Sequence, residues 1–214
     1  MERARAVEHL ERIIETVESE EMPVPIRELW VFGELALGLD PLERMDIYLT
    51  KDILIDGSSK VAQELEDRFD VAGIGTVVRE SWATAHPEHI RTNPNGYVAP
   101  EKCLGAHLLP ADEPIHLEVC NAGFESNVTQ RLEAAVSRDT YEELLDPRAV
   151  CVWRDGVRSD EALEKLRDGA YVFPTLEEAL SMLGLDDEEA SAAADTLISW
   201  KADLEGQSVR GDVI

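Results

Sequence analysis

Histidine and cysteine side chains gather in the middle of the chain. Four histidines and two cysteines lie between residues 86 and 120: His86, His89, Cys103, His107, His116 and Cys120. A transition metal could use such a set. His86 and His89 have i,i+3 spacing, while His116, Glu118 and Cys120 alternate along one predicted strand face. Neither spacing belongs to a known metal site, so we interpret the histidines as loop and edge residues and Cys120 as a core residue.

Cys120 also raises the question of nucleophilic catalysis, because His116 is expected on the same strand face. A reactive thiol needs a basic neighbour or a helix N-terminus that lowers its pKa, and the sequence offers neither beside Cys120. The chain contains a third cysteine, Cys151, and no CxxC pair. Reduced thiols in a cytosolic protein are the simplest account.

Apolar spacing predicts the elements that position these residues. Helical periodicity predicts helices at 2–19, 58–69, 101–109, 127–137, 159–167, 175–183 and 187–204, with a helical turn at 81–85. Ser58 or Ser59 is the expected N-cap of the second helix. Apolar runs predict strands at 28–32, 45–50, 73–78, 114–120 and 150–153. A long loop is expected at 86–100 and a loose tail at 207–214.

These elements predict an α/β fold with a mixed β-sheet flanked by helices. At 214 residues the chain can bury a full core. We expect an α/β core domain at residues 1–146 and a mostly helical C-terminal subdomain at 147–214. No apolar run approaches the length of a membrane span, and the N-terminus is charged and amphipathic rather than signal-like. We therefore expect no membrane partner.

A strand–glycine–turn–glycine–strand pattern follows the first predicted helix. Residues 30–38 read Trp-Val-Phe-Gly-Glu-Leu-Ala-Leu-Gly, and residues 45–49 read Met-Asp-Ile-Tyr-Leu. This pattern resembles the opening motif of the nucleotidyltransferase fold, in which a glycine turn approaches a triphosphate and an Asp-x-Asp pair on the next strand binds magnesium. The resemblance implies nucleotide binding at Gly33, Glu34, Gly38 and Tyr48, and metal binding at Asp46 and, on a third strand, Glu118.

Two positions depart from the motif. Glu34 replaces the serine that would meet phosphate, and Tyr48 replaces the second metal carboxylate. Asp46 with Glu118 alone makes a poor two-metal clamp, since magnesium needs near-octahedral oxygen ligands. We therefore predict a non-catalytic or vestigial nucleotidyltransferase-like domain, without catalytic residues, that binds a nucleotide or a protein partner. Mg²⁺ is the cofactor that the resemblance implies.

Other interpretations of the same sequence stay open. One is an active, metal-dependent nucleotidyltransferase that uses Asp46 and Glu118. Another is a purely structural or interaction module, with the acidic C-terminal helices as its docking surface. The glycine motif could also be an ordinary strand–turn–strand unit in which Gly33 and Gly38 only supply turns.

The whole chain is also similar to an uncharacterised family of haloarchaeal proteins. The similarity rests on Phe-Gly-Glu-Leu-Ala-Leu-Gly-Leu-Asp-Pro at 32–41, Tyr-Leu-Thr-Lys-Asp at 48–52 and His-Leu-Glu-Val-Cys-Asn at 116–121. It implies no activity, but it agrees with the charge of the chain.

The charge balance is extreme, with 45 acidic residues against 20 Lys and Arg and a net charge of −25. Such an excess makes a folded chain repel itself unless salt screens the charges. The composition is 44% apolar, which argues against disorder. The charge balance therefore indicates a protein of a high-salt cytoplasm. The same charge, together with the absence of Lys and Arg clusters, argues against binding to nucleic-acid backbones.

Overall fold

The chain begins with an amphipathic helix that packs on a sheet. The computed structural model describes residues 1–54, 59–138, 140–203 and 206–212. Helix α1 (Arg3–Ser19) buries a stripe at helical spacing that includes Val7, Leu10 and Ile14. The helix is followed by Met22 and Pro23, and proline cannot continue a helical hydrogen-bond ladder. The chain then enters the first strand.

The centre of the molecule is a mixed six-stranded sheet with the order β5-β4-β1-β2-β3-β6. Its strands are β1 (Ile26–Phe32), β2 (Met45–Lys51), β3 (Ile115–Cys120), β4 (Ala149–Arg154), β5 (Val157–Arg158) and β6 (Ser208–Arg210). β1 is antiparallel to β2 and β4, and β4 to β5, whereas β2–β3 and β3–β6 are parallel. The predicted α/β class and mixed sheet are confirmed.

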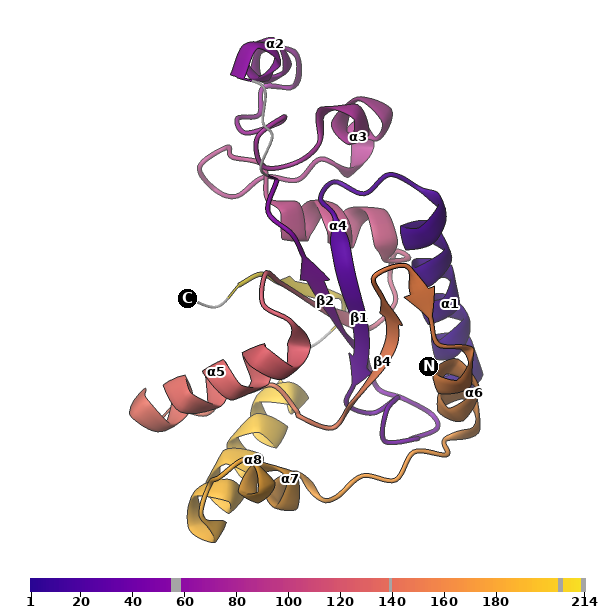
Figure 1. Cartoon of the computed structure of the whole chain (residues 1–214), viewed down its shortest axis with the longest axis vertical. Helices are drawn as coiled ribbons and strands as arrows, with labels where there is room; N and C mark the ends of the chain where they lie inside the picture. The colour runs from indigo at the N-terminus through magenta and orange to yellow at the C-terminus, as the bar shows by residue number, and fades with distance from the viewer. Residues whose placement is uncertain (55–58, 139, 204–205, 213–214) are drawn as a thin grey trace.

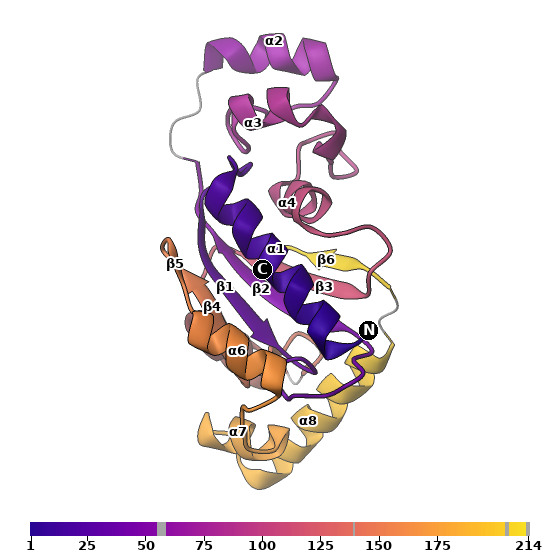
Figure 2. The same cartoon turned by 90° about the vertical axis from the view of Figure 1, so that its right-hand side faces the viewer.

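The two faces of the sheet differ in chemistry. One face is apolar. Helices α1, α4 (Pro100–Leu108) and α6 (Asp160–Asp168) cover this face (Figures 1 and 2). The other face carries aromatic residues that pack against α5 (Phe124–Arg138), together with a row of polar side chains. That row, which includes Asp46, His116 and Glu118, is buried. The polar residues therefore lie inside the protein rather than on its surface.

A small lobe caps one end of the sheet (Figure 1). It contains α2 (Ser59–Phe69), α3 (Glu80–Ala85) and the 3₁₀ helix η1 (Pro87–His89). Its own apolar core is built around Trp82. Ser58, one of two residues predicted to cap α2, lies outside the described residues.

Two further helices, α7 (Leu176–Met182) and α8 (Asp187–Ala202), pack together at the opposite end (Figure 2). The segment 147–214 thus supplies α6, α7 and α8 but also β4, β5 and β6 of the common sheet. The domain boundary at 146 stays a prediction, and it runs through the sheet. Among the described residues, no helix combines the length and apolarity needed to cross a bilayer.

Two predicted elements are wrong. The segment predicted as a strand at 73–78 joins no sheet, and only isolated bridges occur there. Gly73 and Gly75 both have positive φ, which turns the backbone out of the extended conformation. Residues 208–210 of the tail that was expected to be loose instead form β6, which is an edge strand of the sheet and pairs with β3 along His116–Glu118.

Candidate functional site

The turn after β1 brings the backbone against a buried carboxylate. Gly33 has φ +69°, and a Cβ at this position would lie 2.2 Å from Oδ2 of Asp46. Only glycine leaves room for Asp46, which is 2% exposed. Gly38 (φ +75°) performs a different task, because a Cβ there would meet the backbone of Gly169 at 3.1 Å. Gly33 therefore shapes the site, whereas Gly38 allows the turn to pack on the end of α6.

A pocket of about 310 Å³ lies beside this turn. Its lining includes Gly33, Glu34, Arg44, Asp46, Asp146, Arg148, Leu197, Ile198 and Lys201. The β1–β2 connection, the segment before β4 and helix α8 each supply part of the wall. Charged groups from distant parts of the sequence therefore meet at one place.

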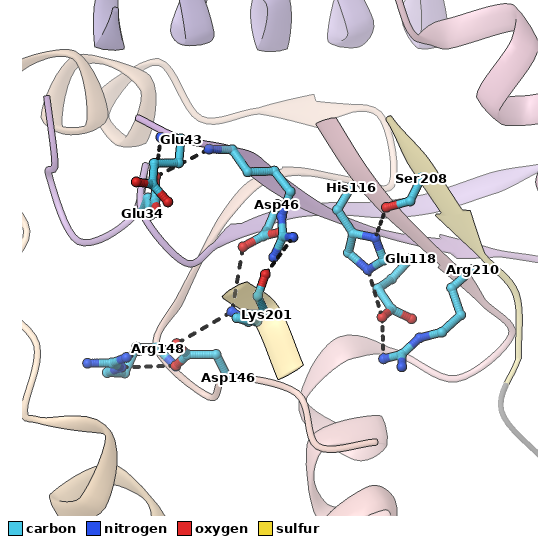
Figure 3. Close-up of polar contacts among 11 residues, drawn as sticks. Glu34, Glu43, Asp46, His116, Glu118, Asp146, Arg148, Lys201, Ser208 and Arg210 are labelled. Carbon is cyan, nitrogen blue, oxygen red and sulfur yellow. Dashed lines mark hydrogen bonds and ion pairs between the residues drawn. The ribbon is translucent and has the colours of Figure 1, made fainter. Parts of the chain in front are cut away.

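Asp46 is held by two cations (Figure 3). Arg44 Nε donates to Asp46 Oδ1 at 2.8 Å, and Lys201 Nζ lies 3.5 Å from Asp46 Oδ2. Arg44 also donates from Nη1 to the carbonyl oxygen of Lys201 at 3.2 Å. The same arginine therefore fixes both the carboxylate and the end of α8 that carries the lysine.

A second buried carboxylate faces Lys201 from the other side of the pocket. Asp146 is 3% exposed and accepts two hydrogen bonds of 2.9 Å from Nε and Nη2 of Arg148. Its Oδ2 lies 3.9 Å from Lys201 Nζ. The ammonium also lies 4.9 Å from the centre of the Phe32 ring. Figure 3 shows Lys201 between Asp46 and Asp146.

Glu34 turns towards the backbone rather than into the pocket centre. Its Oε2 accepts hydrogen bonds from the backbone N–H groups of Glu43 at 2.6 Å and Arg44 at 3.3 Å. The carboxylate thus fastens the residues that lead into β2. This contact explains a carboxylate at the motif position where the resemblance expects a serine.

Glu118 sits in a separate network on the neighbouring strand β3. It is 1% exposed and accepts from Arg131 Nη2 and His116 Nε2, each at 3.0 Å, and it pairs with Arg210. His116 Nδ1 lies 2.7 Å from Ser208 Oγ in β6. Burial by itself would raise the pKa of Glu118, but the His116 hydrogen bond and the charges of Arg210 and Arg131 lower that pKa to about 2.

Tyr48 and Cys120 are core residues on the same sheet face. Both are fully buried. The Tyr48 hydroxyl donates to the Ala122 carbonyl and accepts from Asn127 Nδ2, both at 2.7 Å. Burial raises the pKa of Tyr48 and that of the Cys120 thiol, so both groups stay neutral near pH 7. A neutral thiol is a poor nucleophile, which argues against catalysis by Cys120.

The carboxylates do not fit a magnesium ion as they stand. Asp46 pairs in register with His116, and Glu118 with Tyr48, so the two acids are two residues out of step on adjacent strands. Their Cα atoms are then roughly 8 Å apart. Asp46 is bound to Arg44 and Lys201, while Glu118 is bound to three other cationic or N–H donors. Magnesium would have to displace these partners to gain oxygen ligands.

A family model matches residues 2–214 of the sequence, and its description reads "Family of unknown function (DUF7095)". The chain belongs to the DUF7095 family. No curated protein matches the sequence, and no solved structure matches the chain. The match confirms that the chain is a member of an uncharacterised family. Functional inference for this family therefore rests on the geometry of its residues.

The sequence did not point to the partners of Asp46. Arg44 and Lys201 are 157 residues apart, and nothing in the local spacing connects them. Asp146 precedes Pro147 and marks only the end of the predicted core domain. One local signal was present: Arg44 stands two residues before Asp46, the separation that brings side chains to the same side of an extended chain.

Replacement of Gly33 by alanine should damage this site more than a matched change elsewhere. Gly96 has a similar φ of +76°, but a Cβ there meets nothing within 4 Å. Gly96→Ala should therefore cost only the left-handed backbone strain of about 1–2 kcal/mol. Gly33→Ala also pushes Asp46 away from its cations and should cost at least about 3 kcal/mol. Thermal melts of both variants measure the difference, and equal losses would contradict this account.

Proposed function

We propose that the protein is a non-catalytic, nucleotidyltransferase-like domain that binds a small anionic ligand, such as a nucleotide, in the pocket beside Gly33. Lys201 takes the place of a divalent cation in this proposal. The observation that carries it is the position of the Lys201 ammonium between Asp46 and Asp146. An ammonium supplies positive charge and three donors, but it lacks the coordination that aligns a triphosphate for transfer.

The order of elements around the pocket supports the proposal. A first strand ends in a glycine turn, an antiparallel second strand carries Asp46, and a parallel third strand carries Glu118. The order of glycine turn, Asp-bearing strand and third acidic strand is the one that the motif resemblance implies; the strand directions are additional features of this sheet. The proposed nucleotide contacts are Gly33 and Glu34 at the pocket wall, whereas Gly38 and Tyr48 support the turn and the core.

The contacts of Lys201 support binding of an anion. Its distances to Asp46 and Asp146, 3.5 and 3.9 Å, are longer than a typical N–H···O hydrogen bond. Neither carboxylate therefore holds the ammonium by a short hydrogen bond, and we infer that it can donate to a ligand oxygen. Leu197 and Ile198 add apolar surface for a ring, and the volume of about 310 Å³ suits a single small molecule rather than a polymer.

Calorimetric titration with ATP, GTP, CTP and UTP in molar salt and EDTA tests the proposal. At least one nucleotide should bind, and excess magnesium should not tighten binding. Lys201→Met should weaken it about tenfold or more, because a hydrogen bond from a charged group is worth about 1.5–3 kcal/mol. Lys165→Met is the matched control, because that lysine is exposed and pairs with Glu161 on α6.

The outcomes separate the alternatives. Binding that requires magnesium, or nucleotidyl transfer that is lost in Asp46→Ala, would favour an active enzyme that uses Asp46 and Glu118. Absence of binding by all four nucleotides would overturn the ligand proposal. It would then favour an interaction module whose acidic C-terminal helices dock a protein partner.

We also propose that the domain works in a high-salt cytoplasm, without nucleic-acid or membrane partners. The support is the net charge of −25. Several of the scarce cations are already used inside the protein, since Arg44, Arg131 and Arg148 pair with buried carboxylates. The outer surface is left with an excess of carboxylates, which repels phosphate backbones and anionic headgroups.

A further inference from the structure

Three imidazoles meet where the α2–α3 lobe joins the sheet. His86 follows the end of α3, His89 ends η1, and His107 lies near the end of α4. One ring nitrogen from each histidine lies within 4.8 Å of the other two. The ring centres of His86 and His89 lie 4.6 and 5.1 Å from that of His107. Three imidazoles at one point are a ligand set for zinc and neighbouring transition metals.

We propose that His86, His89 and His107 form a binding site for a first-row transition-metal dication, with Zn²⁺ as the ion of choice. The site is independent of the Gly33 pocket and of the function proposed for it. Three protein ligands leave a fourth position for water, and His86 and His89 are both partly exposed there.

The geometry of two rings fits one metal centre. Nδ1 of His89 and Nδ1 of His107 are 3.0 Å apart. Around tetrahedral zinc with Zn–N distances of about 2.0–2.1 Å, two ligand nitrogens are separated by roughly 3.3 Å. The two nitrogens, which form a hydrogen bond with each other in this structure, thus lie at nearly the separation that a shared metal ion requires.

Carboxylates stand behind both rings. Nε2 of His107 lies 3.3 Å from Glu20 Oε2, and Nε2 of His89 lies 3.9 Å from Glu88 Oε1. Metal-binding histidines commonly direct their second nitrogen to a carboxylate, which fixes the tautomer and the ring orientation. His107 Nε2 is buried and makes no aligned hydrogen bond within the described part of the chain. A metal bound at Nδ1 would fix the orientation of the His107 ring, and Nε2 could then donate a hydrogen bond to Glu20.

An aromatic side chain packs against two of the three rings. The ring centre of Trp82 lies 5.9 Å from that of His86 and 5.8 Å from that of His107. This packing restricts the movement of both imidazoles, which favours a pre-formed ligand set.

A metal at this point would fasten the lobe to the sheet. Helix α4 lies so close to β6 that a Cβ at Gly105 would be 2.6 Å from Val209 Cγ2. His107 is therefore carried by the body of the protein, whereas His86 and His89 belong to the lobe built around Trp82. Helix α4 already contributes Cys103 to the core of the lobe and Leu104 to the core under the sheet, and coordination by all three histidines would add a further link beside this packing.

Zinc titration of the full chain tests the site. The protein is stripped with EDTA, dialysed and titrated with ZnCl₂ in molar sodium sulfate, which screens charge with little competing chloride. Excess magnesium occupies the surface carboxylates. We expect one zinc per chain and a higher melting temperature. His86→Gln and His89→Gln should each weaken binding at least about 100-fold, while His9→Gln, outside the cluster, should not.

A second variant probes the carboxylate behind His107. Glu20→Gln should weaken zinc binding about 10–100-fold while the metal-free melting temperature stays that of the wild type. Cobalt should bind the wild type with the visible absorption of a tetrahedral complex and lose that spectrum in His89→Gln. Absence of stoichiometric zinc binding, or binding that survives both His86→Gln and His89→Gln, would overturn the proposal.

Discussion

In millimolar potassium chloride the purified chain should have no cooperative melting transition, and in molar potassium chloride it should regain one. The net charge of −25 is confined to the folded volume, while the unfolded chain spreads it over a larger one. The Debye length falls from about 30 Å at 0.01 M salt to about 3 Å at 1 M. For a charged sphere of this size, the self-repulsion removed by that change is on the order of 10 kcal/mol.

That magnitude decides the outcome, because domains are stable by only about 5–15 kcal/mol. Repulsion of this size can therefore offset the whole free energy of folding, even though no stabilising contact has been removed by mutation. Acidification should replace part of the salt requirement, since protonated carboxylates no longer repel one another, until native ion pairs such as those of Glu118 are lost.

Circular dichroism melts from low millimolar to molar potassium chloride measure the effect. Sucrose is the control, because it favours compact states by exclusion from the surface and screens no charge. Sucrose alone should not restore the transition at low salt. A melting temperature that stays flat or falls as potassium chloride increases would remove the high-salt proposal.

Local patterns were sufficient for the elements with strong periodicity. The stripe of α1 and the apolar runs of β1, β2 and β3 predicted their elements to within a few residues. The prediction of a strand at 73–78 is wrong because Ile74, Val77 and Val78 have the apolar pattern of a strand, whereas Gly73 and Gly75 turn the backbone. The strand β6 could not be predicted, because a strand of three residues has no recognisable pattern and is stabilised by its pairing with β3.

In the pocket beside Gly33, too, some residues could be predicted from the sequence and others could not. Asp46 and its relation to Gly33 could be predicted, since a glycine turn and the following strand are local features. The identity of its partners could not, because Lys201 and Asp146 reach the pocket only through tertiary packing. The histidines obey the same rule: the His86–His89 pair is visible in the sequence, but its meeting with His107 depends on how the lobe sits on α4.

Glu118→Gln should be the most damaging single change on the polar face of the sheet. The carboxylate neutralises Arg131, whose side chain is 5% exposed, and it also pairs with Arg210 and His116. Removal of one partner from a buried ion pair costs about 3–5 kcal/mol, because the remaining charge is left without compensation. For a chain of this length that loss lowers the melting temperature by roughly 10 °C.

Glu133→Gln separates this loss from the change in net charge. Glu133 is exposed on α5, the same helix that carries Arg131. Both variants remove one negative charge from an over-acidic chain, which by itself slightly favours folding. Glu133→Gln should therefore melt at or slightly above the wild-type temperature, and only Glu118→Gln should fall.

The contribution of Glu118 to stability should also depend on pH in a characteristic way. The pKa of Glu118 is about 2 in the folded protein, below the ordinary value of 4.5, so its contribution to stability is complete above pH 4.5 and is lost as the pH falls towards 2. A shift of this size corresponds to about 3 kcal/mol. The stability gap between the wild type and Glu118→Gln, measured by urea unfolding in molar salt, should thus narrow by about that amount between pH 5 and pH 2. A gap that is small at pH 7, or that does not change over this range, would show that Glu118 does not hold the buried cations in place.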